Sequence, residues 1–342
     1  MKRFASVLTL LIIFVTGYFY LNNAGDIVPL QDSECVSLSK ATRVIDSPGT
    51  YCLEADLLVD TNDVGITILS SDVSLDLQGN AVKRIETRQK ITNAEIGIRL
   101  TDVERVTVTN GNIEGFYVGV SVDNSQEISL SDLEIFDIDF TGVRLNSSKN
   151  FVVSNSFIRD VGGHVELDGG NYAIGIQASG LDGIIHNNEI TKILPQGNIQ
   201  IGEGVGILLS ADAKIIVENN KISGLADQID ETIGIWMGKN SRVQIRGNLI
   251  RNVERGIVGN PKSSIILANV LVLPEQKVHD QEGCCWGIFV GSYEGLGTEV
   301  RNNKIVNYDP SLTIIDGHQA ITKIENNTCD QSGTTLCSVV RQ

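Results

Sequence analysis

The sequence predicts an all-β solenoid, and three observations support that prediction. A phrase of the form Gly-Ile-x-Leu, followed by an alternating apolar run that ends in Asn-Asn-x-Ile, returns along most of the 342-residue chain. Within each copy apolar and polar residues alternate, as they do in strands with one buried face. The copies start 22 or 23 residues apart where they are closest, and a repeat of this period is typical of solenoids. The clearest copies begin at Gly97, Gly142, Gly206 and Gly234.

Each copy reads as three strands and three turns. The Gly-Ile-x-Leu strand is followed by a Val-x-Val or Ile-x-Val strand, the Asn-Asn pair makes a bend, and x-Ile begins a third strand. One copy cannot bury its own apolar side chains, so neighbouring copies must stack about 4.8 Å apart. The sequence therefore predicts a single-stranded parallel β-helix of about ten coils with capped ends, on the order of 45 Å long.

Two interior rows of side chains follow from the alternation. The first row takes one residue from each Gly-Ile strand, and we expect it to contain Ile66, Ile98, Val120, Val143, Ile176, Ile207, Ile235, Ile257 and Ile288. The second row takes the residue that ends each Asn-Asn-x-Ile phrase, and we expect Val82, Ile113, Ile135, Ile158, Ile190, Ile222, Ile250, Val272 and Ile305.

The Asn-rich column predicts a structural ladder and not a binding motif. Asn tolerates a left-handed backbone conformation, and its side chain can bond to the next coil. We expect the column to consist of Asn110, Asp132, Asn155, Asn187, Asn219, Asn269, Asn302 and Asn326. The glycines that precede each strand are interpreted as turn residues.

Residues 1–24 have the form of a leader. Lys2 and Arg3 precede an apolar run, as in secretory signals, although Asn22 is a poor residue before a cleavage site at Ala24. Residues 4–21 are also long enough for an uncleaved membrane anchor, so both interpretations remain. We expect a signal peptide or anchor at 1–24, an N-terminal cap and first coil at 25–60, the β-helix at 61–330 and a C-terminal cap or tail at 331–342. Both interpretations export the folded part, as a secreted, periplasmic or cell-surface protein.

The charge balance is strongly acidic. The formal net charge is −15 at pH 7, and it becomes −17 if Lys2 and Arg3 are removed with the leader. Such a field disfavours nucleic acid and anionic membrane surfaces as partners. It would also repel an anionic polysaccharide unless a cation or a local Arg cluster intervened.

Six cysteines in an exported chain predict disulfides. Two of them precede the first clear repeat and two follow the last, so we expect Cys35–Cys52 and Cys329–Cys337 as staples at the ends, where a solenoid needs capping. Cys284 and Cys285 are adjacent, and three states remain open for them: a strained vicinal disulfide, free thiols, or bridges between two chains.

Two segments near the start of the repeat carry a family resemblance. They read Ser-Pro-Gly-Thr-Tyr-Cys-Leu at 47–53 and Val-Ser-Leu-Asp-Leu-Gln-Gly at 73–79. With the repeat, they make residues 45–330 similar to the right-handed parallel β-helix repeat proteins of the pectate-lyase-like superfold. The resemblance implies a right-handed coil. The superfold includes polysaccharide lyases, glycoside hydrolases, epimerases, esterases and adhesins, so it implies no single function.

The extra residues of the longer repeats all fall in one turn. Between Gly65 and Gly287 the long repeats exceed the short ones only between the x-Ile strand and the next Gly-Ile strand, at 83–96, 159–174, 191–205, 223–233 and 273–286. Insertions confined to one turn project from one edge of a solenoid, which is often its binding face. The resemblance implies that the neighbouring Gly-Ile sheet hosts the cleft of polysaccharide-active members.

Alternation also predicts which side chains the Gly-Ile sheet turns outward. One part of this face is polar and includes Arg99, Asp123 and Arg144, whereas the other part is apolar and includes Leu208, Trp236 and Phe289. Aromatic rings beside polar groups suit a sugar chain. We therefore expect a polysaccharide or another glycan as the partner, with substrate-binding residues Arg99, Gln177, Trp236, Phe289 and Tyr172. The alternative is a surface ion ladder of little energetic value.

Candidate catalytic residues lie beside the polar part. A lyase or epimerase needs a cation to neutralise a uronate and a base to take the ring proton. Arg144 or Arg99 could supply the cation, and His164 or Tyr172 the base. A hydrolase needs two carboxylates, for which Asp123, Asp139 and Asp168 are candidates. Asp137 and Asp139 are alternative calcium ligands. A non-catalytic binding or adhesive module is the competing interpretation, and the Gly-His-Gly and Arg-x-Lys patterns of polygalacturonase-like hydrolases are absent from the sequence.

Overall fold

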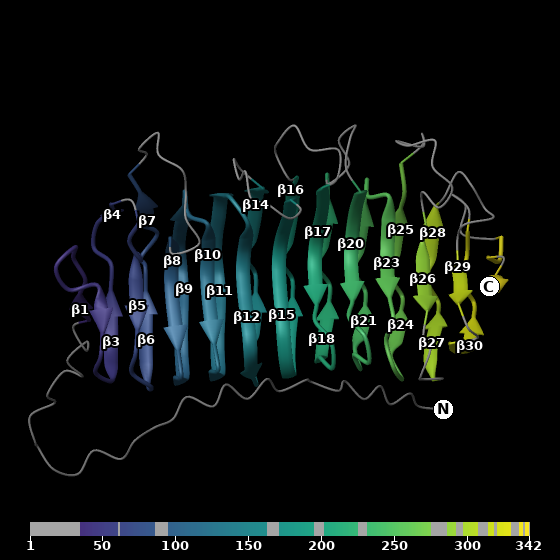
Figure 1. Ribbon diagram of the computed structural model, residues 1–342, viewed down its shortest axis with the longest axis horizontal. Helices are drawn as coiled ribbons and strands as arrows, with labels where there is room; N and C mark the ends of the chain where they lie inside the picture. The colour runs from purple at the N-terminus through teal and green to yellow at the C-terminus, as the bar shows by residue number, and fades with distance from the viewer. Residues whose placement is uncertain are drawn as a thin grey trace, which may run out of the picture. The chain divides into compact units, whose positions relative to one another are not determined.

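The computed structural model describes residues 35–60, 62–85, 95–162, 171–194, 202–224, 231–274, 286–291, 297–306, 314–317, 320–329, 335–337 and 339–341. The chain divides into two compact units, 1–34 and 35–342, and all the described residues belong to the second. In these residues the regular secondary structure is entirely β-strand, and the strands stack side by side into three parallel sheets (Figure 1).

Sheet 1 contains the Gly-Ile strands, stacked in sequence order. They are β2 (Val44–Ile45), β5 (Ile66–Ile68), β8 (Ile96–Thr101), β10 (Val118–Asp123), β12 (Thr141–Lys149), the first part of β15 (Asn171–His186), β17 (Gly202–Leu209), β20 (Glu231–Met237), β23 (Arg255–Gly259), β26 (Ile288–Gly291), β29 (Ile314–Gly317) and β31 (Val339–Arg341).

Sheet 2 contains the second strand of each coil. Its members are β1 (Val36–Ser37), β3 (Gly49–Cys52), β6 (Val73–Asp76), the first parts of β9 (Glu104–Glu114) and β11 (Gln126–Ile138), β13 (Val152–Ser154), the last part of β15, β18 (Lys214–Glu218), β21 (Gln244–Arg246), β24 (Ile265–Leu267), β27 (Thr298–Arg301) and β30 (Ile321–Glu325).

Sheet 3 contains the third strand of each coil. Its members are β4 (Leu57–Val59), β7 (Ala81–Arg84), the last parts of β9 and β11, β14 (Phe157–Val161), β16 (Glu189–Ile193), β19 (Lys221–Ser223), β22 (Leu249–Arg251), β25 (Val270–Val272) and β28 (Lys304–Val306). The three sheets together form the predicted parallel β-helix.

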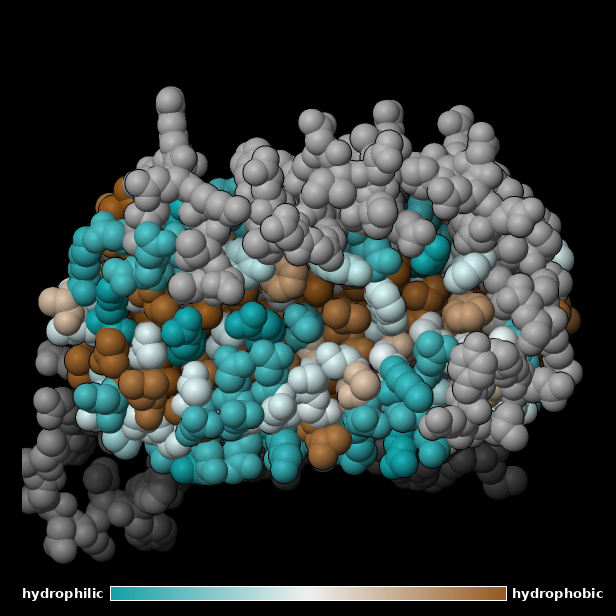
Figure 2. Space-filling view, in the orientation of Figure 1, coloured by the Kyte–Doolittle hydropathy of each residue, from teal (hydrophilic) through white to brown (hydrophobic). Residues whose placement is uncertain are grey.

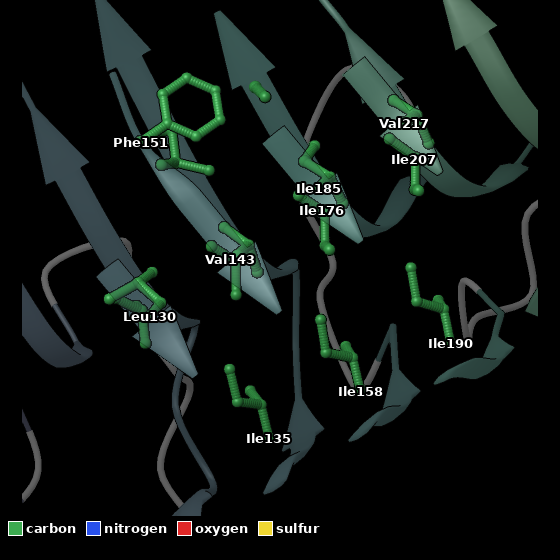
Figure 3. Close-up of a cluster of buried hydrophobic side chains, with 14 of the residues drawn as sticks. Leu130, Ile135, Val143, Phe151, Ile158, Ile176, Ile185, Ile190, Ile207 and Val217 are labelled. Carbon is green, nitrogen blue, oxygen red and sulfur yellow. The ribbon is translucent and has the colours of Figure 1, made fainter. Parts of the chain in front are cut away.

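The interior is filled by rows of aliphatic side chains that run along the stack. Figure 3 shows Val143, Ile176 and Ile207 in one row and Ile135, Ile158 and Ile190 in another, all fully buried. The predicted rows are confirmed except at one position, where Leu271 and not Val272 lies opposite Ile250 and is fully buried. The reason is that Asn269 is the second member of its pair, so the inward residue comes one position earlier than predicted.

The Asn ladder exists, but the second residue of each pair builds it. The first residues, such as Asn187 and Asn219, are exposed and left-handed, with φ of 56° and 55°. The second residues are buried: Oδ1 of Asn220 accepts the backbone N–H of Asn188 at 2.9 Å, and Oδ1 of Asn248 accepts that of Asn220 at 3.0 Å. Of the predicted column only Asn269 belongs to this ladder, because the left-handed position before it is taken by Ala268.

The column of glycines in sheet 1 reflects lack of space. A Cβ on Gly119 would lie 2.5 Å from the carbonyl oxygen of Gly142 and 2.6 Å from a methyl group of Ile135, and Gly206 is equally confined. The interpretation of these glycines as turn residues is therefore wrong, since they lie within the strands and permit the close approach of sheet 3.

Both predicted end disulfides are present. Cys35–Cys52 ties β1 to β3 with Cα atoms 5.6 Å apart, and Cys329–Cys337 joins the segment after β30 to the final turn, with Cα atoms 4.9 Å apart. Within the expected cap or tail at 331–342, β31 pairs with β29 of sheet 1. The expected leader 1–24 and the Cys284–Cys285 pair lie outside the described residues.

The outer surface of the β-helix mixes polar and apolar residues. On the face shown in Figure 2, a hydrophobic band runs along the stack, and hydrophilic side chains gather at its lower margin. Within the described chain there is no helix long and apolar enough to cross a membrane.

Candidate functional site

The outward column of sheet 1 has the predicted composition. Strand register places Arg99 opposite Ser121, Ser121 opposite Arg144, and Arg144 opposite Gln177. The same column continues through Leu208, Trp236, Val258 and Phe289. The polar and aromatic parts of this face are therefore neighbours along one row, with adjacent members about 4.8 Å apart.

The polar part is held by hydrogen bonds and not by an ion ladder. The guanidinium of Arg144 donates to Ser121 Oγ from Nη2 at 3.0 Å and from Nε at 3.3 Å, and Ser121 donates to Asp123 Oδ2 at 3.0 Å. Asn146 donates to the other oxygen of Asp123 at 2.8 Å. Among the described residues no ion pair joins Asp123 to either arginine, and Arg99 forms none at all. The ion-ladder interpretation is therefore wrong.

Tyr117 and Asp139, from two neighbouring turns, complete this part of the face. Tyr117 and Phe140 occupy equivalent positions in successive coils, and their rings stack with centroids 5.1 Å apart. Asp139 precedes Phe140 and is only 7% exposed. The turns that carry them, between β9 and β10 and between β11 and β12, are the short ones without insertions. We call Arg99, Tyr117, Asp123, Asp139 and Arg144 the arginine cluster.

The electrostatics of Tyr117 tie it to this cluster. Burial, the largest cause, raises the pKa of its hydroxyl above the ordinary value of 10.0, while the charge of Arg144 opposes the shift and that of Asp139 adds to it. A tyrosine with a raised pKa is protonated at neutral pH. Burial therefore favours the neutral hydroxyl of Tyr117, which can donate a hydrogen bond.

The aromatic part of the face forms an apolar cluster separate from the interior. Ile174, Val205, Ile233 and Val258 are its buried members, and Leu208, Trp236, Trp286 and Phe289 pack against them. The rings of Trp286 and Phe289 stack with centroids 4.9 Å apart. The guanidinium of Arg255 lies 5.0 Å above the Trp286 ring. Half-buried aromatic rings of this kind offer flat surfaces to a ligand.

The remaining predicted residues are placed as follows. Tyr172 is 44% exposed and lies opposite Glu203 in sheet 1, at the position that corresponds to Asp139 in the preceding coil. His164 and Asp168 lie outside the described residues, as do most of the five insertions. Asp137 is exposed whereas Asp139 is buried, and no group of three potential metal ligands occurs in the described part of the chain.

Tyr117 was not predicted, although the sequence contains a signal for it. It lies in Gly-Phe-Tyr-Val-Gly, at 115–119, in a repeat of only 22 residues. The turn between β9 and β10 is short, so the edge of sheet 1 carries no inserted chain there. The side chain of Tyr117 lies at that position.

Comparison with known proteins identifies the family. The sequence matches the family described as right-handed beta helix region over residues 59–197 and 172–341, and the chain belongs to that family. No match to a curated protein sequence is found.

Solved structures share the fold at low identity. An alginate lyase from Paenibacillus sp. is 14% identical with a TM-score of 0.54, over 83% of this chain and 93% of the other. An exopolygalacturonase from Thermotoga maritima is 12% identical with a TM-score of 0.51, over 82% and 84%. The Dettilon tailspike protein is 15% identical with a TM-score of 0.51, over 85% and 60%. Such low identities establish the shared fold alone.

Proposed function

We propose that this protein binds a glycan along the outer face of sheet 1, with an acidic sugar unit held between Arg99 and Arg144. The observation that carries the proposal is the state of the charges in the arginine cluster. Asp123 accepts hydrogen bonds from Ser121 and Asn146 and forms no direct ion pair with either guanidinium, and Arg99 has no ion-pair partner in the described chain. Two cations remain on alternate strands, about 10 Å apart at their backbones.

The aromatic part of the face supplies the rest of the site. Trp236 and Phe289 lie in the same outward row as Arg144 and present rings for the apolar faces of sugars. A chain of several sugar units would therefore contact cations at one end and aromatic rings at the other. The alginate lyase and exopolygalacturonase with the same fold are named for polysaccharide substrates, which supports this substrate class.

Cleavage of the bound glycan is the more specific form of the proposal. Arg144 would neutralise the carboxylate of a uronate, and protonated Tyr117 would donate a proton to the leaving oxygen. Asp139, buried beside them, is a candidate base. His164 and Asp168 remain candidates from the neighbouring insertion.

A non-catalytic binding module is the second candidate function. One observation favours it: both carboxylate oxygens of Asp123 accept hydrogen bonds within the site, which makes this group a poor nucleophile or base. Such an arrangement fixes side chains for recognition, and it requires no proton transfer.

The test compares binding and turnover in matched variants. We expect the double variant Arg99→Gln/Arg144→Gln to bind oligogalacturonate or oligomannuronate at least tenfold more weakly than the wild type, because both cations are lost. Isothermal titration calorimetry measures the affinity, and Arg251→Gln, an exposed arginine on sheet 3, is the control. Equal affinity in the double variant would contradict the proposal.

The same proteins separate an enzyme from a binder. In a lyase, the wild type produces unsaturated sugar ends, and Tyr117→Phe binds normally but loses at least tenfold in turnover. In a hydrolase, reducing ends appear without unsaturation. Binding without any new chain ends identifies the non-catalytic module.

We also propose that the protein is exported. The two disulfides at the ends of the β-helix support this, because such bonds persist in oxidising compartments. A glycan partner outside the cell agrees with the same location.

A further inference from the structure

A basic pocket lies at the corner between sheets 1 and 2, away from the arginine cluster. It has a volume of about 280 Å³ and is lined by Leu181, Asp212, Lys214, Asn240, Arg242 and Lys262. Its basic residues come from three successive coils: Lys214 begins β18, whereas Arg242 and Lys262 lie in the connections β20–β21 and β23–β24. No part of the proposed glycan face contributes to it.

Strand register brings the cations of this pocket together. Ile216 lies opposite Gln244, so Lys214 and Arg242, two residues earlier in each coil, also face each other across one inter-strand spacing of about 4.8 Å. The backbone N–H of Lys262 donates to the backbone carbonyl oxygen of Ser241, the residue before Arg242, at 2.7 Å. Like charges opposite each other are unfavourable. The fold therefore gathers three basic side chains in one place, and one of them, Lys214, is paired with Asp182.

The acidic residues nearby, Asp182 and Asp212, offset only part of this charge. Nζ of Lys214 pairs with Asp182 at 2.5 Å, but Arg242 and Lys262 form no ion pair in the part of the chain that the structure describes. Asp212 is the one carboxylate in the pocket lining. The pocket is thus locally positive on a chain whose formal net charge is −15.

A second hollow adjoins the pocket on the outer face of sheet 2. It has a volume of about 350 Å³ and shares Lys214 and Arg242 with the pocket. Its floor includes the half-buried side chains of Ile184, Ile216 and Ile265. Cations beside an apolar floor suit a ligand that combines a negative group with an apolar face, and a sugar ring with a carboxylate or sulfate substituent has both.

We infer that this basic pocket is a second binding site, specific for an oxyanion group, and that Arg242 and Lys262 are its main ligands. The oxyanion is the carboxylate, sulfate or phosphate of an acidic saccharide, or free inorganic phosphate. The site is independent of the proposed glycan face. A glycan longer than a few units could be held there while another segment of it, or another molecule, occupies sheet 1.

The test is carried out in the Arg99→Gln/Arg144→Gln background, so that the proposed glycan face contributes nothing. Digalacturonate, inorganic phosphate and the neutral disaccharide cellobiose are titrated by calorimetry at low salt. We expect saturable binding of digalacturonate or phosphate but not of cellobiose. Adding Arg242→Gln and Lys262→Gln should raise Kd for the anion at least tenfold, whereas adding Arg251→Gln should leave it unchanged.

The outcomes divide as follows. Binding of both anions with similar affinity identifies an oxyanion site without sugar recognition, and preference for digalacturonate identifies the saccharide as the source. Absence of anion binding in the background variant, or binding that survives Arg242→Gln/Lys262→Gln, overturns the inference. Melting temperatures check that each variant is folded, and failure of the sheet 1 proposal leaves this result unaffected, because both of its arginines are already removed.

Discussion

The chemistry of the arginine cluster depends on how single side chains are partnered. Ser121 is fully buried. Its Oγ accepts a hydrogen bond from Arg144, and its hydroxyl donates one to Asp123. Arg144 is thereby oriented without being neutralised, since a hydroxyl carries no charge. Removal of the hydroxyl would free the guanidinium to reach Asp123.

Tyr117 leads to a prediction about pH. Burial raises its pKa, so the folded state keeps the hydroxyl protonated at a pH where the unfolded chain would ionise. The stability that this provides is complete below pH 10 and is lost as the pH rises through the folded-state pKa. We expect the melting temperature of the wild type to fall more steeply between pH 9 and about 11 than that of Tyr117→Phe.

The control for this measurement is Tyr172→Phe. Tyr172 is 44% exposed, so its substitution should leave the steep fall in place. Parallel melting curves for the wild type and Tyr117→Phe across the alkaline range would show that Tyr117 is not buried as described.

At the level of elements, the bend between sheets 2 and 3 is stabilised by the Asn ladder. Each buried member uses both ends of its amide. Nδ2 of Asn248 donates to Val217 O at 2.9 Å and to Asn269 Oδ1 at 3.0 Å, while Oδ1 accepts from Asn220. The ladder satisfies backbone groups that the tight bend removes from the strands, and buried groups of this kind are costly to leave unpaired.

The ladder predicts a large difference between the two residues of one Asn-Asn pair. Asn220→Leu should lower the free energy of unfolding by about 3 kcal/mol, because it leaves buried donors and acceptors on both neighbouring coils unpaired. Asn219→Gly is the matched control, since its residue is exposed and left-handed, and it should change stability by less than about 0.5 kcal/mol. Urea denaturation measures both, and similar losses in the two variants would contradict the assignment of roles.

At the level of the whole molecule, a solenoid is weakest at its ends. Interior coils are paired on both sides, whereas a terminal coil has a neighbour on one side only. The two disulfides lie at these positions: Cys35–Cys52 closes a separation of 17 residues and Cys329–Cys337 one of 8. They hold β1 on β3 and fix the final turn after β30.

The end disulfides predict a graded loss of stability. Cys35→Ala/Cys52→Ala should lower the free energy of unfolding by about 3 kcal/mol, and Cys329→Ala/Cys337→Ala by slightly less because its loop is shorter. Chemical denaturation measures the loss, and limited proteolysis should begin at the opened end. Reduction of the wild type with dithiothreitol should reproduce the combined loss, and a protein insensitive to reduction would disprove a stapling role.

Export is tested on the protein from its natural source. We expect to recover it outside the cytoplasm with Cys35, Cys52, Cys329 and Cys337 all oxidised. Recovery from the cytoplasm with free thiols would reject this location.

Much of the fold could be predicted because each coil has the same local alternation of apolar and polar residues. Alternation placed Ile176 and Ile207 inside and Arg144 and Trp236 outside, and the strand register agrees. Two errors were shifts of one residue, at Leu271 and in the Asn pairs, and a third assigned the glycines of sheet 1 to turns. Sequence spacing alone does not say which of two adjacent residues turns inward at a bend, because that depends on the coil beneath it.

The candidate site was predicted less completely. Arg99, Asp123 and Arg144 were correctly placed on one face, but their hydrogen-bond partners were not predicted. Ser121 and Asn146 carry no charge, and only the register between coils shows that they contact charged side chains. Tyr117 was missed because its importance comes from stacking on Phe140 and from the neighbouring Arg144 and Asp139.

The sequence by itself determined the coil: its period, its three strands, its interior rows and its two end disulfides all follow from residue type and spacing. The tertiary structure alone decided which polar groups meet. Contacts between coils join residues far apart in the sequence, from 21 positions for Asn248–Asn269 to 37 for Asn303–Ile266. Hydrogen bonds such as Arg144–Ser121, and the facing cations Lys214 and Arg242, therefore depend on the stacking register. A periodic pattern specifies that register only through the fit of one coil on the next, and that fit is a property of the folded molecule.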